Sequence, residues 1–168
     1  MALDKNGFRR VMAFLATGVT VVTTALGEKL HGMTANAVCS VSLEPPLILV
    51  CVDRRSHTHA ILAQSGVFAV NILSEEQEEL ARLFADRGPP QVQSLRGVPY
   101  RLGTTGAPIL EGCIAYAECR VAATYPGGDH TIFLGHVREL KVVREAPPLL
   151  FYRSAYEGLV EKRRTARR

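Results

Sequence analysis

The chain has 168 residues, of which 47% are hydrophobic and 21% are charged, and its formal net charge is +4. This length and composition indicate one ordinary globular domain with a sizeable apolar core. Residues 161–168 hold five cations and one anion, an excess of four that equals the net charge of the whole chain. We therefore predict a folded domain over residues 1–160, whose charges balance, and a basic disordered tail over residues 161–168.

Composition also excludes several classes of partner. The domain lacks the basic excess that nucleic-acid-binding proteins carry, so we expect no nucleic-acid partner. We expect no membrane association, because no segment has the apolar length of a membrane span and residues 1–6 contain no signal-peptide core. We predict a cytoplasmic protein with no bound metal and with reduced, buried thiols. Its four cysteines form no CxxC pair: Cys39, Cys51, Cys113 and Cys119.

The first half of the chain is expected to contain two helices and three strands. Apolar residues at helical spacing predict the first helix, which Gly18 ends. β-branched residues on either side of a Gly-Glu-Lys turn predict a hairpin, and a continuous apolar run predicts a buried strand. Ser56 is the expected N-cap of the second helix. In chain order, these elements cover residues 8–16, 19–25, 30–42, 47–52 and 57–62.

The second half is expected to contain one further helix and three strands. Ser74 and Gln77 have the spacing of a capping box, so they predict a helix start whose apolar stripe enters the core. Residues 87–106 lack periodicity and predict a long surface loop. Residues 126–129 (PGGD) predict a hairpin. The expected strands cover 67–73, 113–125 and 130–143. Because strands and helices do not alternate, the chain is expected to be mainly β, an antiparallel barrel with peripheral helices.

A polar stretch within the second strand is the candidate binding site. Thr34, Asn36, Ser40 and Ser42 occupy even positions, so an unbroken strand would place them on one face. Such a face is too polar for a dry core and suits a planar, hydrogen-bonding ligand. The apolar strand that follows leads to residues 53–56 (DRRS), where two arginines precede a helix start and form a candidate phosphate site.

Other sites are less well supported by the sequence. It contains no GxGxxG, GxxxxGK[ST], GxSxG or HExxH motif, so dinucleotide-fold, P-loop, hydrolase-elbow and zinc-protease sites are not predicted. His57 and His59 are two residues apart and would lie on different faces of a helix, which disfavours a shared metal. His130 follows a Gly-Gly-Asp tip, and together with Tyr152, Arg153 and Tyr156 it could hold a second ligand by stacking and phosphate pairing.

The order of these motifs resembles that of the short-chain flavin reductases, the reductase components of two-component flavin-dependent monooxygenases. The similarity covers roughly residues 7–158 and is specific because the motifs occur in combination. They are residues 17–24 (TGVTVVTT), 32–37 (GMTANA), 40–47 (SVSLEPPL), 68–73 (FAVNIL), 128–130 (GDH) and 148–153 (PLLFYR).

The resemblance implies a split β-barrel of the FMN-binding type in a homodimer, with flavin at or near the subunit interface. It implies that FMN or FAD is reduced by NADH or NADPH and passes by diffusion to a separate flavin-dependent monooxygenase. Ser154 stands where the family commonly has Gly, and the loop over residues 87–95 lacks the aromatic residue often found there.

Carried over by motif, the resemblance also assigns ligand contacts. The flavin ring and ribityl chain would be lined by Thr34, Ala35, Asn36, Ala37, Val38, Cys39, Ser40 and Ser42. The phosphate end would be held by Asp53, Arg54, Arg55, Ser56, His59 and Ala60, with Arg87 reaching the phosphate or adenylate. The nicotinamide nucleotide would face Tyr152, Arg153, Tyr156 and His130, which is the expected catalytic residue.

This assignment agrees with the chemistry that the residues allow. The two cofactors carry out hydride transfer themselves, so the protein needs only to stack their rings and to stabilise charge on the flavin. No acid–base pair is required. Two alternatives stay open: a flavin-binding electron carrier or redox sensor without nicotinamide turnover, and a non-catalytic split-barrel module for another phosphorylated cofactor. Gly128, Asp129 and His130, with Tyr152 and Arg153, favour the reductase because a simple carrier does not need them.

Overall fold

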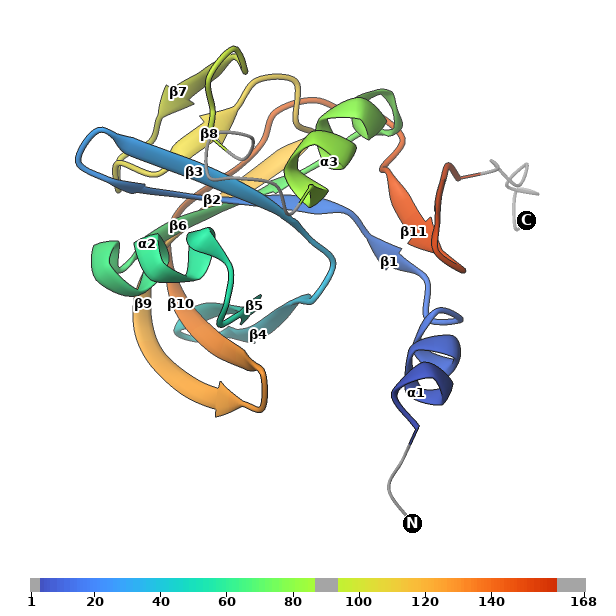
Figure 1. Ribbon diagram of the computed structural model, residues 1–168. Helices are drawn as coiled ribbons and strands as arrows, with labels where there is room; N and C mark the ends of the chain where they lie inside the picture. The colour runs from blue at the N-terminus through green and yellow to red at the C-terminus, as the bar shows by residue number, and fades with distance from the viewer. Residues whose placement is uncertain (1–3, 87–93, 160–168) are drawn as a thin grey trace.

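A computed structural model describes residues 4–86 and 94–159 of the chain. Its centre is a seven-stranded sheet in the order β3-β2-β6-β9-β10-β5-β4, and every neighbouring pair is antiparallel (Figure 1). The expectation of a mainly β chain with peripheral helices is confirmed. The strands are β2 (Thr20–Leu26), β3 (Lys29–Ala35), β4 (Val38–Leu43), β5 (Pro46–Asp53), β6 (Val67–Ile72), β9 (Ala115–Gly127) and β10 (His130–Val142).

Two small sheets and three α-helices complete the fold. α2 packs against β2 and β3, and α3 packs against β3, whereas α1 stands away from the body of the molecule (Figure 1). The small sheets are β1 (Thr17–Gly18) with β11 (Leu150–Tyr152) and β12 (Ala155–Glu157), and β7 (Tyr100–Leu102) with β8 (Pro108–Leu110). The helices are α1 (Lys5–Met12), α2 (His57–Ser65) and α3 (Glu78–Ala85), which follows the 3-10 turn η1 (Glu75–Gln77).

Two apolar clusters lie on opposite sides of β2. Val22 belongs to the cluster that contains Leu62 of α2, and the adjacent Val21 belongs to the cluster that contains Phe84 of α3. Because successive strand residues point to opposite faces, a strand covered on both sides is buried at every position, as residues 20–24 are. This double burial explains why the strand has no polar alternation in its sequence.

The expected starts of the second and third helices and both expected hairpins are confirmed. The Ser56 hydroxyl accepts a hydrogen bond from the His59 backbone N–H at 3.1 Å, and Ser74 and Gln77 form the capping box before α3. β2 and β3 form a hairpin, and so do β9 and β10, whose pairing continues to His130 and Gly127 at the tip. Short-range turn and cap chemistry therefore determined these boundaries.

The expectation of one unbroken strand over residues 30–42 is wrong. β3 ends at Ala35 and β4 begins at Val38, and the β4–β5 register shifts between Ser40 and Ser42. β3 pairs with β2 and β4 pairs with β5, at opposite ends of the seven-stranded order. The chain must therefore leave the sheet between them. Among the described strands, β3 and β4 share no ladder, so the curved sheet stays open at this point.

Three other expectations need correction, and two lie outside the described residues. The first helix covers Lys5–Met12 rather than residues 8–16, because the Asp4 carboxylate caps it by accepting backbone N–H groups from Asn6 and Gly7, both at 3.1 Å. Gly18 lies in β1 and does not end this helix. The expected surface loop contains β7, which pairs with β8. Arg87 and residues 161–168 lie outside the described residues.

Candidate functional site

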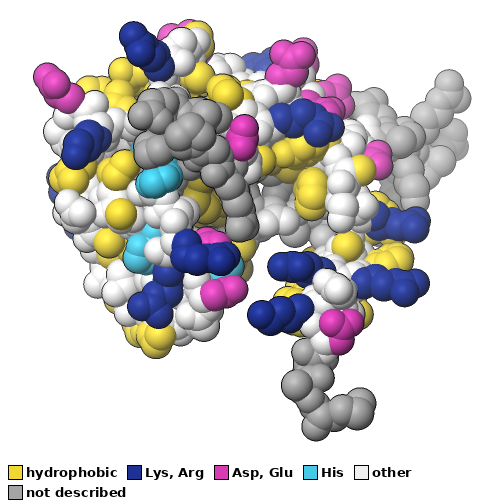
Figure 2. Space-filling view, viewed as in Figure 1, with side chains coloured by type: hydrophobic (Ala, Val, Ile, Leu, Met, Phe, Trp, Pro, Cys, Tyr) yellow, Lys and Arg dark blue, Asp and Glu magenta, His cyan; other side chains and the backbone are white. Residues whose placement is uncertain are grey.

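A cleft of about 460 Å³ opens where β3, β5, β10 and two helices meet. Its volume is within the range of small-molecule sites, about 300–1,000 Å³. Histidine, basic (Lys or Arg) and acidic side chains lie close together on the face shown at the left of Figure 2. The cleft is lined by Met33, Thr34, Ala35, Asn36, Ala37, Cys51, Asp53, Arg55, Ser56, His57, Phe84, Ala85 and His130.

Residues 33–37 form one wall of the cleft, and both ends of this segment are fixed. The Thr34 hydroxyl donates to the backbone carbonyl of Ala81 in α3 at 2.6 Å. The Cys51 backbone N–H donates to the carbonyl of Ala37 at 3.0 Å, although Asn36 and Ala37 lie outside the strands. Asn36 and Ala37 are exposed, so an irregular, fixed segment of backbone faces the cleft.

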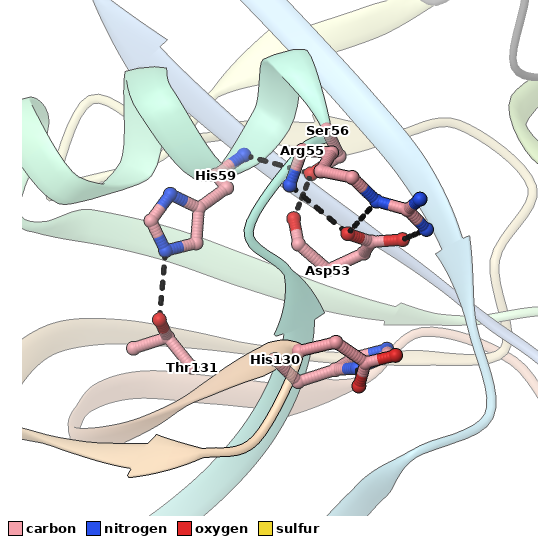
Figure 3. A network of polar contacts seen from close by, with 7 residues as sticks. Asp53, Arg55, Ser56, His59, His130 and Thr131 are labelled. Atoms are coloured by element: carbon pink, nitrogen blue, oxygen red, sulfur yellow. Dashed lines mark hydrogen bonds and ion pairs between the residues drawn. The ribbon is translucent and has the colours of Figure 1, made fainter.

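The turn between β5 and α2 carries the cationic end of the cleft (Figure 3). Three nitrogen atoms of Arg55 donate hydrogen bonds to the Asp53 carboxylate: the backbone N at 2.9 Å, Nε at 3.2 Å and Nη2 at 3.0 Å. The Ser56 hydroxyl donates to the carbonyl of Asp53 at 2.8 Å while it caps α2. A guanidinium and a helix N-terminus therefore lie together at this end, an arrangement that suits an anion.

His130 joins the cleft from the tip of the β9–β10 hairpin. It pairs with Asp53 in the β5–β10 ladder, and its Nδ1 lies 2.7 Å from Asp129 Oδ1. The hydrogen bond and charge of His130 lower the pKa of the Asp129 carboxyl. The Arg54 backbone N–H donates to the carbonyl of Asp129 at 3.1 Å, which ties the β5–α2 turn to the hairpin tip.

His59 of α2 connects the helix to β10 behind the cleft. Its Nε2 lies 2.8 Å from the Thr131 hydroxyl, and its ring meets Phe133 edge-on at 5.4 Å between centroids (Figure 3 shows the Thr131 contact). Burial lowers the pKa of His59, and the charge of Arg54 lowers it further. The two contacts fasten α2 to the sheet, and burial disfavours the charged form of this imidazole.

The structure brings together eight of the residues that the sequence assigned to ligands. They line the cleft: Thr34, Ala35, Asn36, Ala37, Asp53, Arg55, Ser56 and His130. The other assigned residues near it do not line it: Val38, Cys39, Ser40 and Ser42 lie along β4, Arg54 lies in the turn, and His59 and Ala60 lie in α2.

The three other residues assigned to the nicotinamide nucleotide lie elsewhere in the chain. Tyr152, Arg153 and Tyr156 belong to the β11–β12 hairpin of the separate three-stranded sheet, beside α1 (Figure 1). The Tyr152 and Phe14 rings meet edge-on at 6.3 Å, and the Arg153 guanidinium lies 5.3 Å from the Phe14 ring centroid. Tyr152 and Arg153 therefore adjoin the segment that follows α1. The Tyr156 ring instead lies 4.9 Å from the Arg82 guanidinium of α3, and none of the three residues lines the cleft.

Five cleft residues were not assigned from the sequence. They are Met33, Cys51, His57, Phe84 and Ala85. Met33 and Cys51 belong to strands that lead into the assigned segments, and His57 follows Ser56 directly, so proximity in sequence could have indicated them. Phe84 was expected only as part of the apolar core, and it is 1% exposed. Its place in the cleft depends on α3 packing against β3, which no local pattern shows.

Comparison with known proteins agrees with this fold and site. A family model described as a flavin reductase like domain matches residues 12–160. The reductase subunit HsaB of a flavin-dependent monooxygenase from Rhodococcus jostii is 37% identical over 158 residues, which are 94% of this chain and 80% of that protein. An NADH-dependent FAD reductase from Streptomyces globisporus is 47% identical over 136 residues, 80% of this chain and 74% of that protein.

A solved structure has the same fold over nearly the whole chain. The nitrilotriacetate monooxygenase component B homologue from Mycobacterium thermoresistibile aligns with a TM-score of 0.89 and 35% identity, covering 98% of this chain and 92% of that chain. The chain belongs to the flavin reductase-like family. The resemblance identified from the sequence motifs is therefore confirmed, together with the fold class. In the described part of the chain, no helix has the length and apolar character needed to cross a bilayer.

Proposed function

We propose that the chain uses NADH or NADPH to reduce FMN or FAD, and that the reduced flavin diffuses to a separate flavin-dependent monooxygenase. The chain is an oxidoreductase, a nicotinamide-dependent flavin reductase. The observation that carries the proposal is the cleft itself, in which a wall of small residues and backbone leads to a cationic helix start. An electron carrier without nicotinamide turnover is not favoured, because the relatives described above include a reductase subunit and an NADH-dependent reductase.

The residues present fit a phosphorylated flavin. Ala35, Asn36 and Ala37 offer a wall that a flat ring can approach closely, and Arg55 and the start of α2 offer charge and N–H groups to a phosphate. Hydride transfer is chemistry that the bound cofactors supply. The work of the protein is to stack the rings, exclude water and orient donors toward the flavin. The presence of His130 in the lining of the cleft supports its proposed contact with the nicotinamide nucleotide.

The proposal includes a homodimer. α1 contains no buried residue, and it presents the apolar side chains of Phe8 and Val11, which are 61% and 70% exposed. In Figure 2 basic side chains, Lys or Arg, lie beside apolar side chains on this part of the surface. A second copy that covers α1 would remove these side chains from water. It would also allow residues of the β11–β12 hairpin of one subunit to approach the cleft of the other.

A cytoplasmic location also belongs to the proposal. Each of the four cysteines is a free thiol, and two of them, Cys113 and Cys119, are buried. Free thiols are typical of reducing compartments, where nicotinamide nucleotides are also available.

The test of the proposal is turnover that depends on added flavin. Oxidation of NADH or NADPH is followed by the loss of reduced-nicotinamide absorbance, without flavin and then with FMN or FAD. We expect turnover only when flavin is added, and the best pair identifies the cofactors. A protein that binds flavin but oxidises neither nucleotide would contradict the proposal and support an electron carrier. A protein that binds no flavin would support the non-catalytic module.

A further inference from the structure

Asp53 is an acidic residue at the end of the cleft where a phosphate is expected to bind. Its side chain is 14% exposed, while the Arg55 side chain beside it is 77% exposed. Both carboxylate oxygens face Arg55: Oδ1 accepts from the backbone N and from Nε, and Oδ2 accepts from Nη2 (Figure 3). A half-buried carboxylate therefore holds an exposed guanidinium in a fixed orientation at the mouth of the cleft.

Direct contact between Asp53 and a phosphate would be unfavourable. Two negative groups at contact distance repel each other, and the repulsion is stronger where the surroundings exclude water. A carboxylate that served only as part of the wall would therefore weaken binding of a phosphorylated ligand. The geometry instead points to a role through the neighbouring cation.

We propose that Asp53 is a positioning residue that does not touch the ligand and acts through Arg55, whose guanidinium it aims at the terminal phosphate of the bound flavin. This inference rests on the proposed function, because it takes the cationic end of the cleft as the flavin phosphate site. An arginine side chain loses rotamer entropy when it is fixed. Asp53 fixes this side chain before the ligand arrives, so ligand binding does not bear that cost.

The guanidinium can serve both partners at the same time. It has five N–H donors in a planar fork, and Asp53 engages one on Nε and one on Nη2. The other three donors are those that can meet phosphate oxygens. The carboxylate also raises the pKa of Arg55 through its hydrogen bond and charge.

The backbone of Asp53 has separate duties that a side-chain substitution leaves in place. Its carbonyl accepts from Ser56 N at 3.0 Å and from Ser56 Oγ at 2.8 Å, and its backbone pairs with His130. Asp53→Ala therefore removes the contact with Arg55 while it keeps the cap of α2 and the strand pairing. Asp53→Asn is the conservative variant, since its amide oxygen can still accept from Arg55.

The experiment compares FMN with riboflavin, which has the same ring system and no phosphate. Dissociation constants of both are measured by flavin fluorescence for the wild type, Asp53→Ala, Asp53→Asn, Arg55→Ala and the Asp53→Ala/Arg55→Ala double variant. We expect Arg55→Ala to weaken FMN binding about tenfold or more, as loss of a charge-assisted hydrogen bond does. Asp53→Ala should weaken FMN binding several-fold, although it removes a negative charge, and Asp53→Asn should restore part of the affinity. Riboflavin binding should change little in all variants.

The double variant gives the decisive comparison. Once Arg55 is absent, loss of Asp53 should leave FMN binding unchanged or strengthen it, because only the repulsion remains to be removed. The inference is overturned if Asp53→Ala strengthens FMN binding in the wild-type background. It is also overturned if Asp53→Ala weakens FMN and riboflavin equally, or if Arg55→Ala leaves the preference for FMN over riboflavin intact. If the inference is overturned but the wild-type protein still oxidises NADH or NADPH when flavin is added, the proposed function stands without the role assigned to Asp53.

Discussion

His130 lies where the β9–β10 hairpin tip reaches the cleft, and its Nδ1 is held by Asp129 at 2.7 Å. This contact leaves Nε2 as the ring nitrogen that can meet a second ligand above the cleft. We predict that His130→Ala raises KM for NADH or slows reduction of bound flavin about tenfold or more, the effect of losing a hydrogen bond to a charged group. The affinity for FMN should change little. Steady-state and rapid-mixing kinetics, with a flavin titration of the same variant, measure both effects.

The matched control for this prediction is His136→Ala. His136 also lies in β10 and pairs with Leu47, and it is not among the cleft residues. His136→Ala should change neither KM for NADH nor the affinity for FMN by more than a small factor. If His130→Ala instead weakens flavin and nucleotide binding to the same degree, His130 belongs to the flavin site or to the fold, and its assigned role is wrong.

His59 gives the protein a predicted dependence of stability on pH. Burial lowers the pKa of His59 in the folded protein, so the folded state binds a proton there less readily than the unfolded chain does. As the pH falls through the ordinary histidine pKa, about 6.5, the unfolded state gains a proton that the folded state does not. The free energy of unfolding therefore falls on acidification, and the contribution is complete above that pH.

The measurement is urea unfolding of the wild type and His59→Gln at about pH 7.5 and about pH 5.5, on either side of the ordinary histidine pKa. Glutamine can keep a hydrogen bond to Thr131 and does not titrate. We expect acidification to destabilise the wild type more than His59→Gln, while the other histidines contribute equally to both. An equal or larger loss in His59→Gln would show that His59 is not the titrating group.

At the scale of elements, local chemistry correctly predicted the start of α2, the helix start after Ser74 and the turn between β9 and β10. Ser56, the Ser74–Gln77 capping box and the Gly-Gly-Asp tip each determine a boundary through contacts within a few residues, so the sequence alone reveals them. The break between Ala35 and Val38 could not be predicted in this way. It follows from pairing with β2 on one side and β5 on the other, and these partners lie at opposite ends of the sheet order.

Gly135 of β10 is another element-level feature that only the fold explains. A Cβ at this position would overlap the ring of Phe68 and lie 2.7 Å from Cys119 Cβ, where the β9–β10 register shifts. We predict that Gly135→Ala lowers the free energy of unfolding by about 1–3 kcal/mol, as overpacking of a core does. Denaturant unfolding of the purified variant measures the change.

Gly18→Ala is the control for this substitution. Gly18 also lies in a strand, but a Cβ there would meet nothing within 4 Å. Gly18→Ala should change the free energy of unfolding by no more than about 0.5 kcal/mol, the range of surface substitutions. If both variants are equally stable, Phe68 and Cys119 yield easily and this part of the core is not tightly packed.

At the scale of the whole molecule, the sequence located one ligand site but could not place the second. Residues 33–37 and 53–57 meet in one cleft because each is a short segment at the end of a strand. His130 joins them through a ladder with β5. Residue type and the family resemblance grouped Tyr152, Arg153 and Tyr156 with His130. The chain places Tyr152 and Arg153 beside the end of α1 and Tyr156 against Arg82 of α3. No local pattern shows how a second copy would bring them closer to the cleft.

The exposed face of α1 makes the proposed dimer testable. Apolar side chains recur at helical spacing at Phe8, Val11 and Met12, and they are 61%, 70% and 44% exposed. Burial of one such side chain contributes about 1.5–3 kcal/mol, so a partner that covers several of them can hold two subunits together. A charge at Val11 costs little in an isolated chain, because the helix buries no residue. The same charge would be buried and unpaired in a dimer.

We therefore predict that Val11→Asp converts a dimer into monomers that stay folded, as measured by light scattering after gel filtration and by circular dichroism. Leu102→Asp is the matched control, since Leu102 is 57% exposed on β7 and its replacement should leave the dimer intact.

If the β11–β12 hairpin of one subunit contributes to the cleft of the other, KM for NADH rises in the Val11→Asp monomer while FMN affinity falls less. A Val11→Asp protein that remains dimeric would exclude α1 from the interface, and that interface would then be sought at the exposed apolar residues of β4 and β10, among them Leu43 and Leu140.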